Sequence, residues 1–266
     1  METPAKPGHS TATPGDGRAV WNEETLADPH HDTAKAERVN AMFNHIAPSY
    51  DLNNRLHSLW MDQSWRRKAV RLAELRPGVD RVVDVACGTG DLALAFAKAG
   101  AKEVRGIDFA PVMIEHAKKK AAGAEAPVKP SFEVGDAMAL AVESSTADIV
   151  SIAFGIRNVA DPRKALQEFR RILRPGGRLV ILEFSEPRQS ILRGLYNFYF
   201  RRIMPHTATW ISGDRTGAYR YLPRSVQTFI TPEAMRRMME EAGFGNVSVR
   251  ALTMGICNAY LGRVEH

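Results

Sequence analysis

Short apolar segments alternate with amphipathic helical segments from residue 81 onward, and this alternation restricts the fold more than any other feature of the chain. Strands are predicted at 81–86, 103–108, 131–135, 148–154 and 178–184, and helices at 90–99, 111–122, 161–173 and 231–242. Strands that are separated by helices form βαβ units and therefore a parallel sheet. Two last strands, 246–252 and 255–264, are predicted to close one sheet edge as a hairpin. We therefore expect an α/β fold with a mostly parallel seven-stranded sheet and helices on both faces.

Three segments lie outside this alternation. Residues 1–34 contain six acidic and two basic residues without periodicity, so they are predicted to be a disordered acidic tail, and deletion of residues 1–30 is expected to leave activity intact. Residues 35–75 form a predicted N-terminal helical cap, with an amphipathic helix that begins near Lys35 and ends near Pro48. Residues 186–224 form a predicted helical insertion before the last strands, over the sheet edge where open α/β folds bind ligands. Residues 35–266 are thus predicted to be one domain.

The composition limits the cellular compartment and the partners that are expected for this domain. Only two cysteines occur in 266 residues, so no disulfide framework is expected and a reducing cytoplasm is favoured. No apolar run approaches the roughly 18 residues of a membrane-spanning helix. The net charge is +6, and the insertion carries seven arginines against two acidic residues, interleaved with aromatic residues. Such an insertion is expected to cover a hydrophobic substrate or to contact a membrane surface. The alternative, that it is a lid helix packed on the core, is equally possible from the sequence.

A glycine-containing loop follows the first strand in the sequence VVDVACGTGDLALA. Gly88 and Gly90 permit a tight turn and a close approach of the backbone to a ligand. Asp108 ends the second strand 18 residues after Gly90, where a carboxylate can accept hydrogen bonds from ribose hydroxyls. Because the same loop satisfies the dinucleotide pattern G-x-G-x-x-A, it alone leaves an NAD(P)-binding oxidoreductase open.

Three features favour S-adenosylmethionine over a dinucleotide. Asp84 precedes the glycines within the strand, where its carboxylate would meet the ammonium end of S-adenosylmethionine and repel a pyrophosphate. Asp136 ends the third strand and is positioned for an adenine amino group, although a turn-capping role would also explain it. The third feature is the terminal hairpin. With these features the chain resembles the class I methyltransferases, which have a Rossmann-like fold.

The resemblance to class I methyltransferases implies a cofactor site at the strand ends. Besides the three aspartates, it implies contacts from Gly88, Thr89, Gly90, Phe109, Ala137 and Ala153. One departure is Ala86, which stands where the pattern usually has a first glycine and fits if its φ is negative. No metal site is expected.

Four stretches support a closer resemblance: HIAPSYDLNNRLHSLWMDQSWRR, AFGIRNVADPRKAL, RILRPGGRLVILEFSEP and AYRYLPRSVQTF. They resemble the ubiquinone/menaquinone biosynthesis C-methyltransferase family, from about Lys35 to the C-terminus. Two departures are Asn53-Asn54 for the usual Met-Asn, and Asp62 for the usual histidine three residues before Trp65.

This family resemblance implies C-methylation of a polyprenyl quinol ring. The expected reaction converts demethylmenaquinol to menaquinol, and many members also methylate 2-methoxy-6-polyprenyl-1,4-benzoquinol. No Asn/Asp-Pro-Pro-aromatic loop follows the fourth strand, which argues against a nucleic-acid substrate.

The loop after the fourth strand presents the residues expected to carry the chemistry. Arg157 and Asn158 follow this strand, where a guanidinium would stabilise the phenolate that forms when the quinol hydroxyl loses its proton, or hold a water that takes the proton. The alternative is that Arg157 pairs with Asp161 or Glu183 and only ties the loop down. Tyr50, from the cap, is expected to pack its ring on the sulfonium.

Four further residues are expected to face the substrate. Asp51 and Asn54 come from the cap, although Asp51 would equally well cap the next helix. Tyr219 and Tyr221 are expected to contact the quinol hydroxyls, unless they pack beneath the insertion. His57 and His206 are candidate bases only by elimination, since lone histidines are more often structural.

Three rival functions stay open at this point. They are methylation of another small molecule or lipid, an NAD(P)-binding oxidoreductase, and a catalytically inactive quinol-binding partner of a biosynthetic complex. The expected partners are a prenylated quinol and, transiently, a membrane surface, without nucleic acid; a homodimer is left open. The expected location is the cytoplasm, with peripheral attachment to the inner face of the membrane as the alternative.

Overall fold

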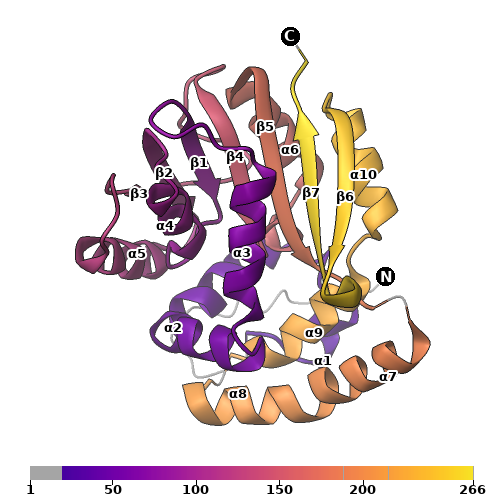
Figure 1. Ribbon diagram of the computed structural model, residues 1–266. Coiled ribbons are helices and arrows are strands. Elements are labelled where there is room, and N and C mark those ends of the chain that lie inside the picture. The colour runs from indigo at the N-terminus through magenta and orange to yellow at the C-terminus, as the bar shows by residue number, and fades with distance from the viewer. Residues whose placement is uncertain (1–19, 188, 215, 266) are drawn as a thin grey trace, which may run out of the picture.

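Seven strands form one sheet in the order β3-β2-β1-β4-β5-β7-β6 in the computed structural model, which describes residues 20–187, 189–214 and 216–265 (Figure 1). The strands are β1 Arg81–Val85, β2 Glu103–Asp108, β3 Ser131–Val134, β4 Ala147–Ala153, β5 Leu173–Phe184, β6 Gly245–Leu252 and β7 Cys257–Arg263. The first five pair in parallel, whereas β7 runs antiparallel to both β5 and β6. The predicted α/β sheet and its terminal hairpin are therefore confirmed.

Helices cover both faces of the sheet. They include α3 Met61–Leu72, α4 Asp91–Lys98, α5 Pro111–Gly123, α6 Pro162–Ile172 and α10 Pro232–Glu241. Neighbouring residues of a strand point to opposite faces, so Val82 packs with α3, α4 and α5, while Val83 packs with α6 and α10. Both apolar layers are thus filled, and the C-terminal edge of the parallel strands is left for other helices.

The helix of the N-terminal cap is longer than predicted. Helix α2 spans Lys35–His57 and passes through Pro48, where the sequence predicted an end. A proline removes one helical hydrogen bond and crowds the preceding turn. Pro48 is exposed and Asn44, whose carbonyl loses its partner, is partly exposed, so water can satisfy that carbonyl. The cap helix therefore continues to His57 and crosses the C-terminal edge of the sheet (Figure 1).

The predicted disorder of residues 1–34 is wrong for residues 20–34, while residues 1–19 lie outside the described residues. Trp21 is fully buried, its ring stacks on Tyr221 at 4.2 Å, and its backbone N–H donates to the carbonyl of Thr216 at 2.9 Å. A short helix follows, α1 Glu23–Ala27, and Arg224 donates to the carbonyl of Leu26 at 2.9 Å. The acidic composition hid this packing, because Trp21 and its few apolar neighbours form no periodic pattern.

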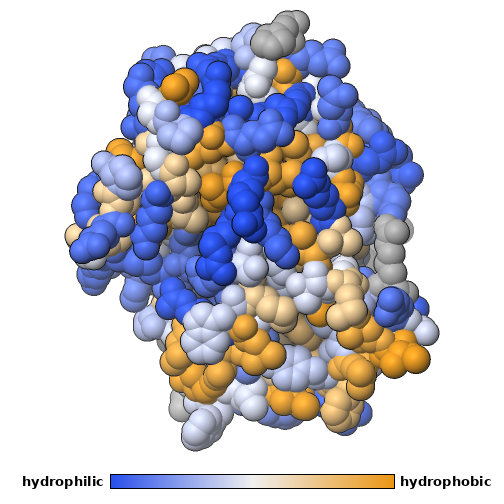
Figure 2. Space-filling view, in the orientation of Figure 1, coloured by the Kyte–Doolittle hydropathy of each residue, from blue (hydrophilic) through white to orange (hydrophobic). Residues whose placement is uncertain are grey.

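The predicted insertion is a chain of helices beneath the sheet edge (Figure 1). It contains α7 Ser190–Phe198, a π-helical turn η2 Tyr199–Ile203, α8 Met204–Ser212 and α9 Ala218–Thr228. Several of its large apolar side chains are exposed, and Figure 2 shows hydrophobic residues along the edge of the molecule where α7 and α8 run. No helix among the described residues is long and apolar enough to cross a membrane.

Candidate active site

Two adjoining cavities lie at the C-terminal edge of the parallel strands. The smaller has a volume of about 110 Å³ and is lined by the ends of β2 and β4 and by the loops after β1 and β3. The larger has a volume of about 320 Å³ and lies between α2, α3, η2 and α9. The side chains of Phe43, Tyr50 and Phe154 line both cavities. A ligand in one cavity would therefore be separated from a ligand in the other by a few aromatic rings.

The glycine loop joins β1 to α4 through three residues in left-handed conformations. Gly88 has φ of 55° and lines the smaller cavity, and its N–H donates to Oδ2 of Asp108 at 2.8 Å. Gly90 has φ of 84°, but a Cβ there would lie 2.8 Å from the ring of Phe132, so this glycine serves packing against β3 rather than a ligand. Ala86 has φ of 49°, so the negative φ under which an alanine would fit easily is not adopted, and this residue carries backbone strain.

Asp108 lies at the end of β2 with its carboxylate towards the smaller cavity. Oδ2 accepts from the Gly88 N–H, and Oδ1 accepts from the Ala110 N–H at 2.9 Å. Burial raises the pKa of this carboxyl group. Each carboxylate oxygen can accept more than one hydrogen bond, so both oxygens keep acceptor capacity for ribose hydroxyls.

Asp84 holds a buried acceptor with no partner. Ser151 donates to its Oδ1 at 2.7 Å, whereas Oδ2 is buried and accepts no hydrogen bond from the described residues. Burial raises the pKa of this carboxyl group to about 7. The side chain lines a recess beside the smaller cavity, shared with Gly88 and Thr89. An ammonium group in this recess would satisfy the free oxygen, which is the fit expected for S-adenosylmethionine.

The remaining predicted cofactor residues either line the smaller cavity or stabilise the loops around it. Asp136 lines the smaller cavity, where its Oδ1 also accepts from the Met138 N–H at 2.9 Å and so caps the turn. Phe109, Ala137 and Ala153 line the same cavity.

Thr89, within the glycine loop, is bound by Asp51 of the cap helix. The hydroxyl of Thr89 donates to Asp51 at 2.6 Å and accepts from Lys120 at 2.9 Å. Lys120 also pairs with the other carboxylate oxygen of Asp51. Asp51 does not line the larger cavity, so its placement differs from the predicted substrate contact: it ties the cap helix to the loop.

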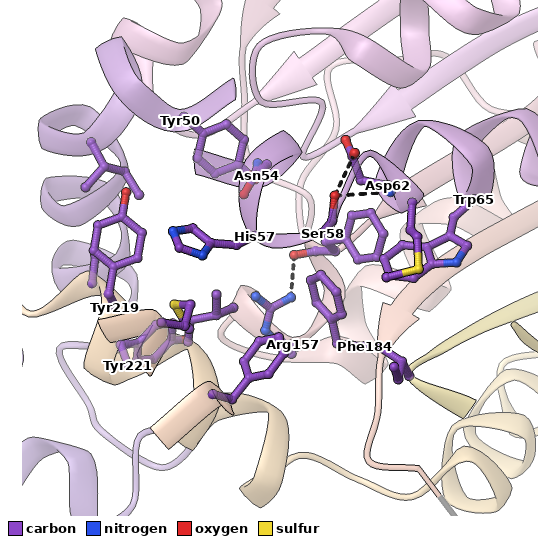
Figure 3. Close-up of a pocket in the computed structure, with 18 of the residues that line it drawn as sticks. Tyr50, Asn54, His57, Ser58, Asp62, Trp65, Arg157, Phe184, Tyr219 and Tyr221 are labelled. Carbon is purple, nitrogen blue, oxygen red and sulfur yellow. Dashed lines mark hydrogen bonds between the residues drawn. The ribbon is translucent and has the colours of Figure 1, made fainter. Parts of the chain in front are cut away.

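Arg157 sits between the cavities and the core. Its Nη1 donates to Glu183 at 2.7 Å and to the carbonyl of Phe154 at 2.6 Å, and its Nε donates to Ser225 at 3.3 Å. The pairing with Glu183 is the alternative that the sequence left open, and both side chains are buried. Nη2 donates to none of the described residues, and Arg157 lines the larger cavity (Figure 3). One guanidinium nitrogen is thus available to a ligand.

The other predicted substrate residues face the larger cavity. Asn54, Tyr219 and Tyr221 line it (Figure 3), and Tyr221 donates to Oδ1 of Asn158 at 2.9 Å. Asn158 lines the smaller cavity, so this pair links the two sites.

Sequence reasoning gave no role to Trp65, Phe154 and Phe184, which form part of the aromatic wall of the larger cavity. Phe154 and Phe184 stack at 4.4 Å, with Trp65 packed against both. Tyr199 and Phe200 complete the wall from the insertion, whose aromatic residues were the available signal. Of the two histidines named by elimination, His57 lines the cavity and His206 is exposed on α8.

The buried Asp84 carboxylate in β1 with one unpartnered oxygen, Asp108 at the end of β2 and an adjoining aromatic cavity are the arrangement expected of an S-adenosylmethionine-dependent methyltransferase. The chain matches the model of the ubiE/COQ5 methyltransferase family over residues 31–263, and it belongs to this family. The NAD(P)-dependent oxidoreductase that the glycine pattern left open is therefore not supported.

Curated relatives agree with this assignment. The chain is 48% identical over 222 residues to "Demethylmenaquinone methyltransferase" of Thermus thermophilus, covering 83% of this chain and 99% of the relative. It is 42% identical over 232 residues to "Ubiquinone/menaquinone biosynthesis C-methyltransferase UbiE" of Geobacter sulfurreducens, covering 86% and 90%.

Solved structures show the same fold at lower identity. The [4+2]-cyclase SpnF has a TM-score of 0.65 at 18% identity, covering 86% of this chain and 97% of that one. A Thermotoga maritima S-adenosylmethionine-dependent methyltransferase, described as a possible histamine N-methyltransferase, has a TM-score of 0.59 at 20% identity, covering 85% and 99%.

Proposed function

We propose that the chain methylates a ring carbon of a polyprenyl quinol, converting demethylmenaquinol to menaquinol. The observation that carries this proposal is the aromatic cavity that adjoins the cofactor cavity through shared side chains. The names of the curated relatives support the same reaction. Because some of these names include ubiquinone, 2-methoxy-6-polyprenyl-1,4-benzoquinol is a second candidate substrate.

The larger cavity suits a ring system better than a whole prenyl lipid. Its volume of about 320 Å³ is near the lower end of the ~300–1,000 Å³ typical of small-molecule sites. The quinol head would fill it, and the prenyl tail would extend outside. Leu59 lines this cavity and is 75% exposed, so it marks a mouth through which the tail can leave.

The cofactor supplies a methyl group that is already activated by the positive sulfur. The protein's task is to hold the ring carbon in line with that methyl, to exclude water and to stabilise the charge on the quinol oxygen. Alignment can lower the barrier by roughly 7–11 kcal/mol. In this proposal the aromatic wall excludes water, Nη2 of Arg157 donates to the developing phenolate, and Asn54, Tyr219 and Tyr221 orient the hydroxyls.

Methyl transfer from labelled S-adenosylmethionine tests the proposal directly. Purified protein in detergent would be supplied separately with reduced demethylmenaquinone, with the reduced methoxy-benzoquinone precursor, and with no acceptor. Label in the first quinol is the expected result, and label in both would extend the substrate range. If the protein binds S-adenosylhomocysteine but labels neither quinol, the proposed methyl acceptor is rejected. That result would also be expected of a catalytically inactive quinol-binding protein.

Contact with a membrane surface is part of this proposal. Ile191, Leu195 and Phe198 are spaced along one side of α7 and are 61–81% exposed, and Trp210 on α8 is 86% exposed. Exposed arginines accompany them at positions 193, 201 and 202. An apolar face with basic residues is typical of helices that lie in a lipid interface, where tryptophan is also enriched.

Sedimentation with lipid vesicles tests this contact. Wild-type protein should sediment with anionic vesicles more than with neutral ones, and Trp210→Ser should lower the affinity for anionic vesicles by about 10–100-fold, because it removes a side chain whose burial contributes roughly 1.5–3 kcal/mol. Thr209→Ser, a neighbouring exposed change, serves as the matched control. Equal sedimentation of both variants would argue against the contact.

A further inference from the structure

His57 lines the larger cavity and has one buried ring nitrogen without a hydrogen-bond partner among the described residues. It is the last residue of α2, and its side chain lies among the residues that line this cavity (Figure 3). Its Nδ1 lies 2.9 Å from the hydroxyl oxygen of Tyr199. Its Nε2 is buried and has no hydrogen-bond partner within the described part of the chain. A histidine with only a structural role would be expected to satisfy both nitrogens.

The partner of His57 comes from the one π-helical turn among the described residues. Tyr199 begins η2, and Tyr199 and the next residue, Phe200, both line the cavity. A π turn widens the helix and is frequent at functional sites. The Tyr199 ring packs against His57 at 6.4 Å and against Phe200 at 5.5 Å. The imidazole is therefore held both by a hydrogen bond and by ring contacts.

The surroundings of His57 keep it neutral. Burial is the one cause that lowers its pKa below the usual 6.5, and burial also raises the pKa of Tyr199. The charged groups that line the cavity are already paired: Arg66 with Asp62 at 2.7 Å, and Arg157 with Glu183 at 2.7 Å. The other titratable groups that line it are Tyr50, Tyr196, Tyr219 and Tyr221.

We propose that Nε2 of His57 is the base that takes the proton of the quinol hydroxyl adjacent to the methylated carbon, with Tyr199 as the residue that positions it. This inference rests on the proposed quinol substrate. In the required tautomer, Nδ1–H donates to the Tyr199 oxygen, and the Nε2 lone pair stays without a donor and can accept a proton. When Nε2 becomes protonated, the Nδ1 bond is kept, so the imidazolium is stabilised in place.

The proton and electron balance follows from this assignment. The hydroxyl O–H bond breaks and an N–H bond forms at Nε2, and the oxygen's electrons move into the ring. The ring carbon then forms its bond to the methyl group while the carbon–sulfur bond breaks and leaves its electron pair on sulfur. The methylated carbon loses its own proton to water, the ring becomes aromatic again, and the quinol oxygen recovers the proton from Nε2.

This step complements Arg157. A guanidinium cannot accept a proton at ordinary pH, so Arg157 stabilises the phenolate and needs a separate base. His206, the other histidine considered, is exposed on α8 and lines neither cavity.

The pH dependence of methyl transfer to reduced demethylmenaquinone tests the role of His57. In wild-type protein, kcat/KM should fall with a single-proton slope below a pKa lower than 6.5. His57→Gln should lower kcat by about 10²–10⁴-fold, the usual contribution of a general base, and should remove that acid limb. Imidazole should restore part of the activity of His57→Ala, and Tyr199→Phe should lower kcat with a smaller change in KM.

Matched controls separate a base from a structural residue. His206→Gln, a change of an exposed histidine on α8 that lines neither cavity, should leave kcat and the pH profile unchanged. Each variant should bind S-adenosylhomocysteine and unfold at the same temperature as wild type. A His57→Gln variant that keeps its kcat and acid limb, with only KM raised, would overturn the proposal.

A second measurement does not depend on turnover. In protein labelled with ¹⁵N in the histidine rings, a short-tailed reduced naphthoquinol should shift the Nε2 signal of His57 towards a hydrogen-bonded value. If wild-type protein methylates neither quinol, the substrate proposal fails, yet this signal still decides whether Nε2 meets a quinol hydroxyl. An unmoved signal with saturating naphthoquinol would overturn the role of His57.

Discussion

The smaller and larger cavities lie side by side but are built from different kinds of structure. Most residues of the smaller cavity follow strands β1, β2, β3 and β4, and helix α2 covers it, so the parallel sheet brings Gly88, Asp108 and Asp136 together. The larger is lined mainly by helices from the cap and the insertion, which are far apart in the sequence, and only a few of its residues follow strands. Strand ends place a side chain through backbone pairing, whereas helices place it through packing.

The two sites also differ in which hydrogen-bond partners their polar atoms use. On the cofactor side, the polar atoms mostly bond to backbone N–H groups of neighbouring loops, and one acceptor is left free for the ligand. On the substrate side, the polar atoms bond to side chains of distant segments, as in the pair of Arg157 with Glu183. Substitutions should therefore affect ligand affinity on the first side and folding stability on the second.

The strongest test of this contrast is Arg157→Leu. It leaves the carboxylate of Glu183, which is 2% exposed, buried without its cation, and breaking such a pair costs about 3–5 kcal/mol of unfolding free energy. Adding Glu183→Gln should recover most of that loss. Urea unfolding measures both changes. If the double variant is stable, binds S-adenosylhomocysteine and yet transfers no methyl, Arg157 also acts on the substrate; restored turnover would make it purely structural.

The next largest effect is expected from Trp21→Ala, which tests how far the substrate side depends on a distant segment. The side chain is fully buried against Tyr221, and its loss should lower the unfolding free energy by about 3 kcal/mol, since the short helix α1 can move to fill part of the space. Quinol KM should rise, because Tyr221 loses its stacking partner. Removal of residues 1–19 is the control. An unaffected KM in Trp21→Ala would separate this segment from the site.

Asp84→Asn, next to the smaller cavity, is expected to have a smaller effect: it should weaken cofactor binding without weakening the fold. It removes a charge that the cofactor ammonium needs, so S-adenosylhomocysteine affinity should fall by about 1–3 kcal/mol, as measured by calorimetry. In the ligand-free protein, however, the same change replaces a buried negative charge by a neutral amide, so the unfolding free energy at pH 8 should not fall. A loss of stability with unchanged affinity would reverse the contrast between the two sites.

The pH dependence of Asp84 gives the same test without mutation. Burial raises its folded pKa to about 7 from 3.8, so the stability that this group contributes is present below pH 4 and is lost as the pH rises through 7. Wild-type unfolding free energy should decline across this window, and the decline should be weaker in Asp84→Asn. Affinity for S-adenosylhomocysteine should rise from pH 6 to pH 8 in wild-type protein alone.

The two sites also differ in how well the sequence predicted them. Asp84 and Asp108 follow a motif of fixed spacing, and the parallel sheet leaves their side chains few places to go. The contact of Trp21 with Tyr221 joins residues 200 positions apart, and nothing local in the sequence specifies it. Asp51 illustrates the same limit: its neighbours in sequence indicated a substrate contact, while Thr89 and Lys120 capture it in the folded chain.

Backbone conformation in the glycine loop was not predicted from the sequence either, and this leads to the smallest expected effect. Ala86 has φ of 49°, a conformation that costs an alanine about 1–2 kcal/mol and a glycine almost nothing. Its Cβ also explains the glycine at 155, because a Cβ on Gly155 would lie 2.6 Å away. Ala86→Gly should therefore raise the unfolding free energy by about 0.5 kcal/mol, once the lost methyl packing and the looser unfolded chain are counted.

Gly155→Ala alone should lower the unfolding free energy by about 1–3 kcal/mol, through the clash with Ala86. The double exchange moves the methyl group from one residue to the other and should return close to wild-type stability, which a double-mutant cycle in urea would measure. Additive effects would mean that the two residues do not constrain each other. Their coupling would show that the chain tolerates alanine at the first loop position because the facing strand end carries a glycine, so even the motif-built cofactor side depends on one non-local contact.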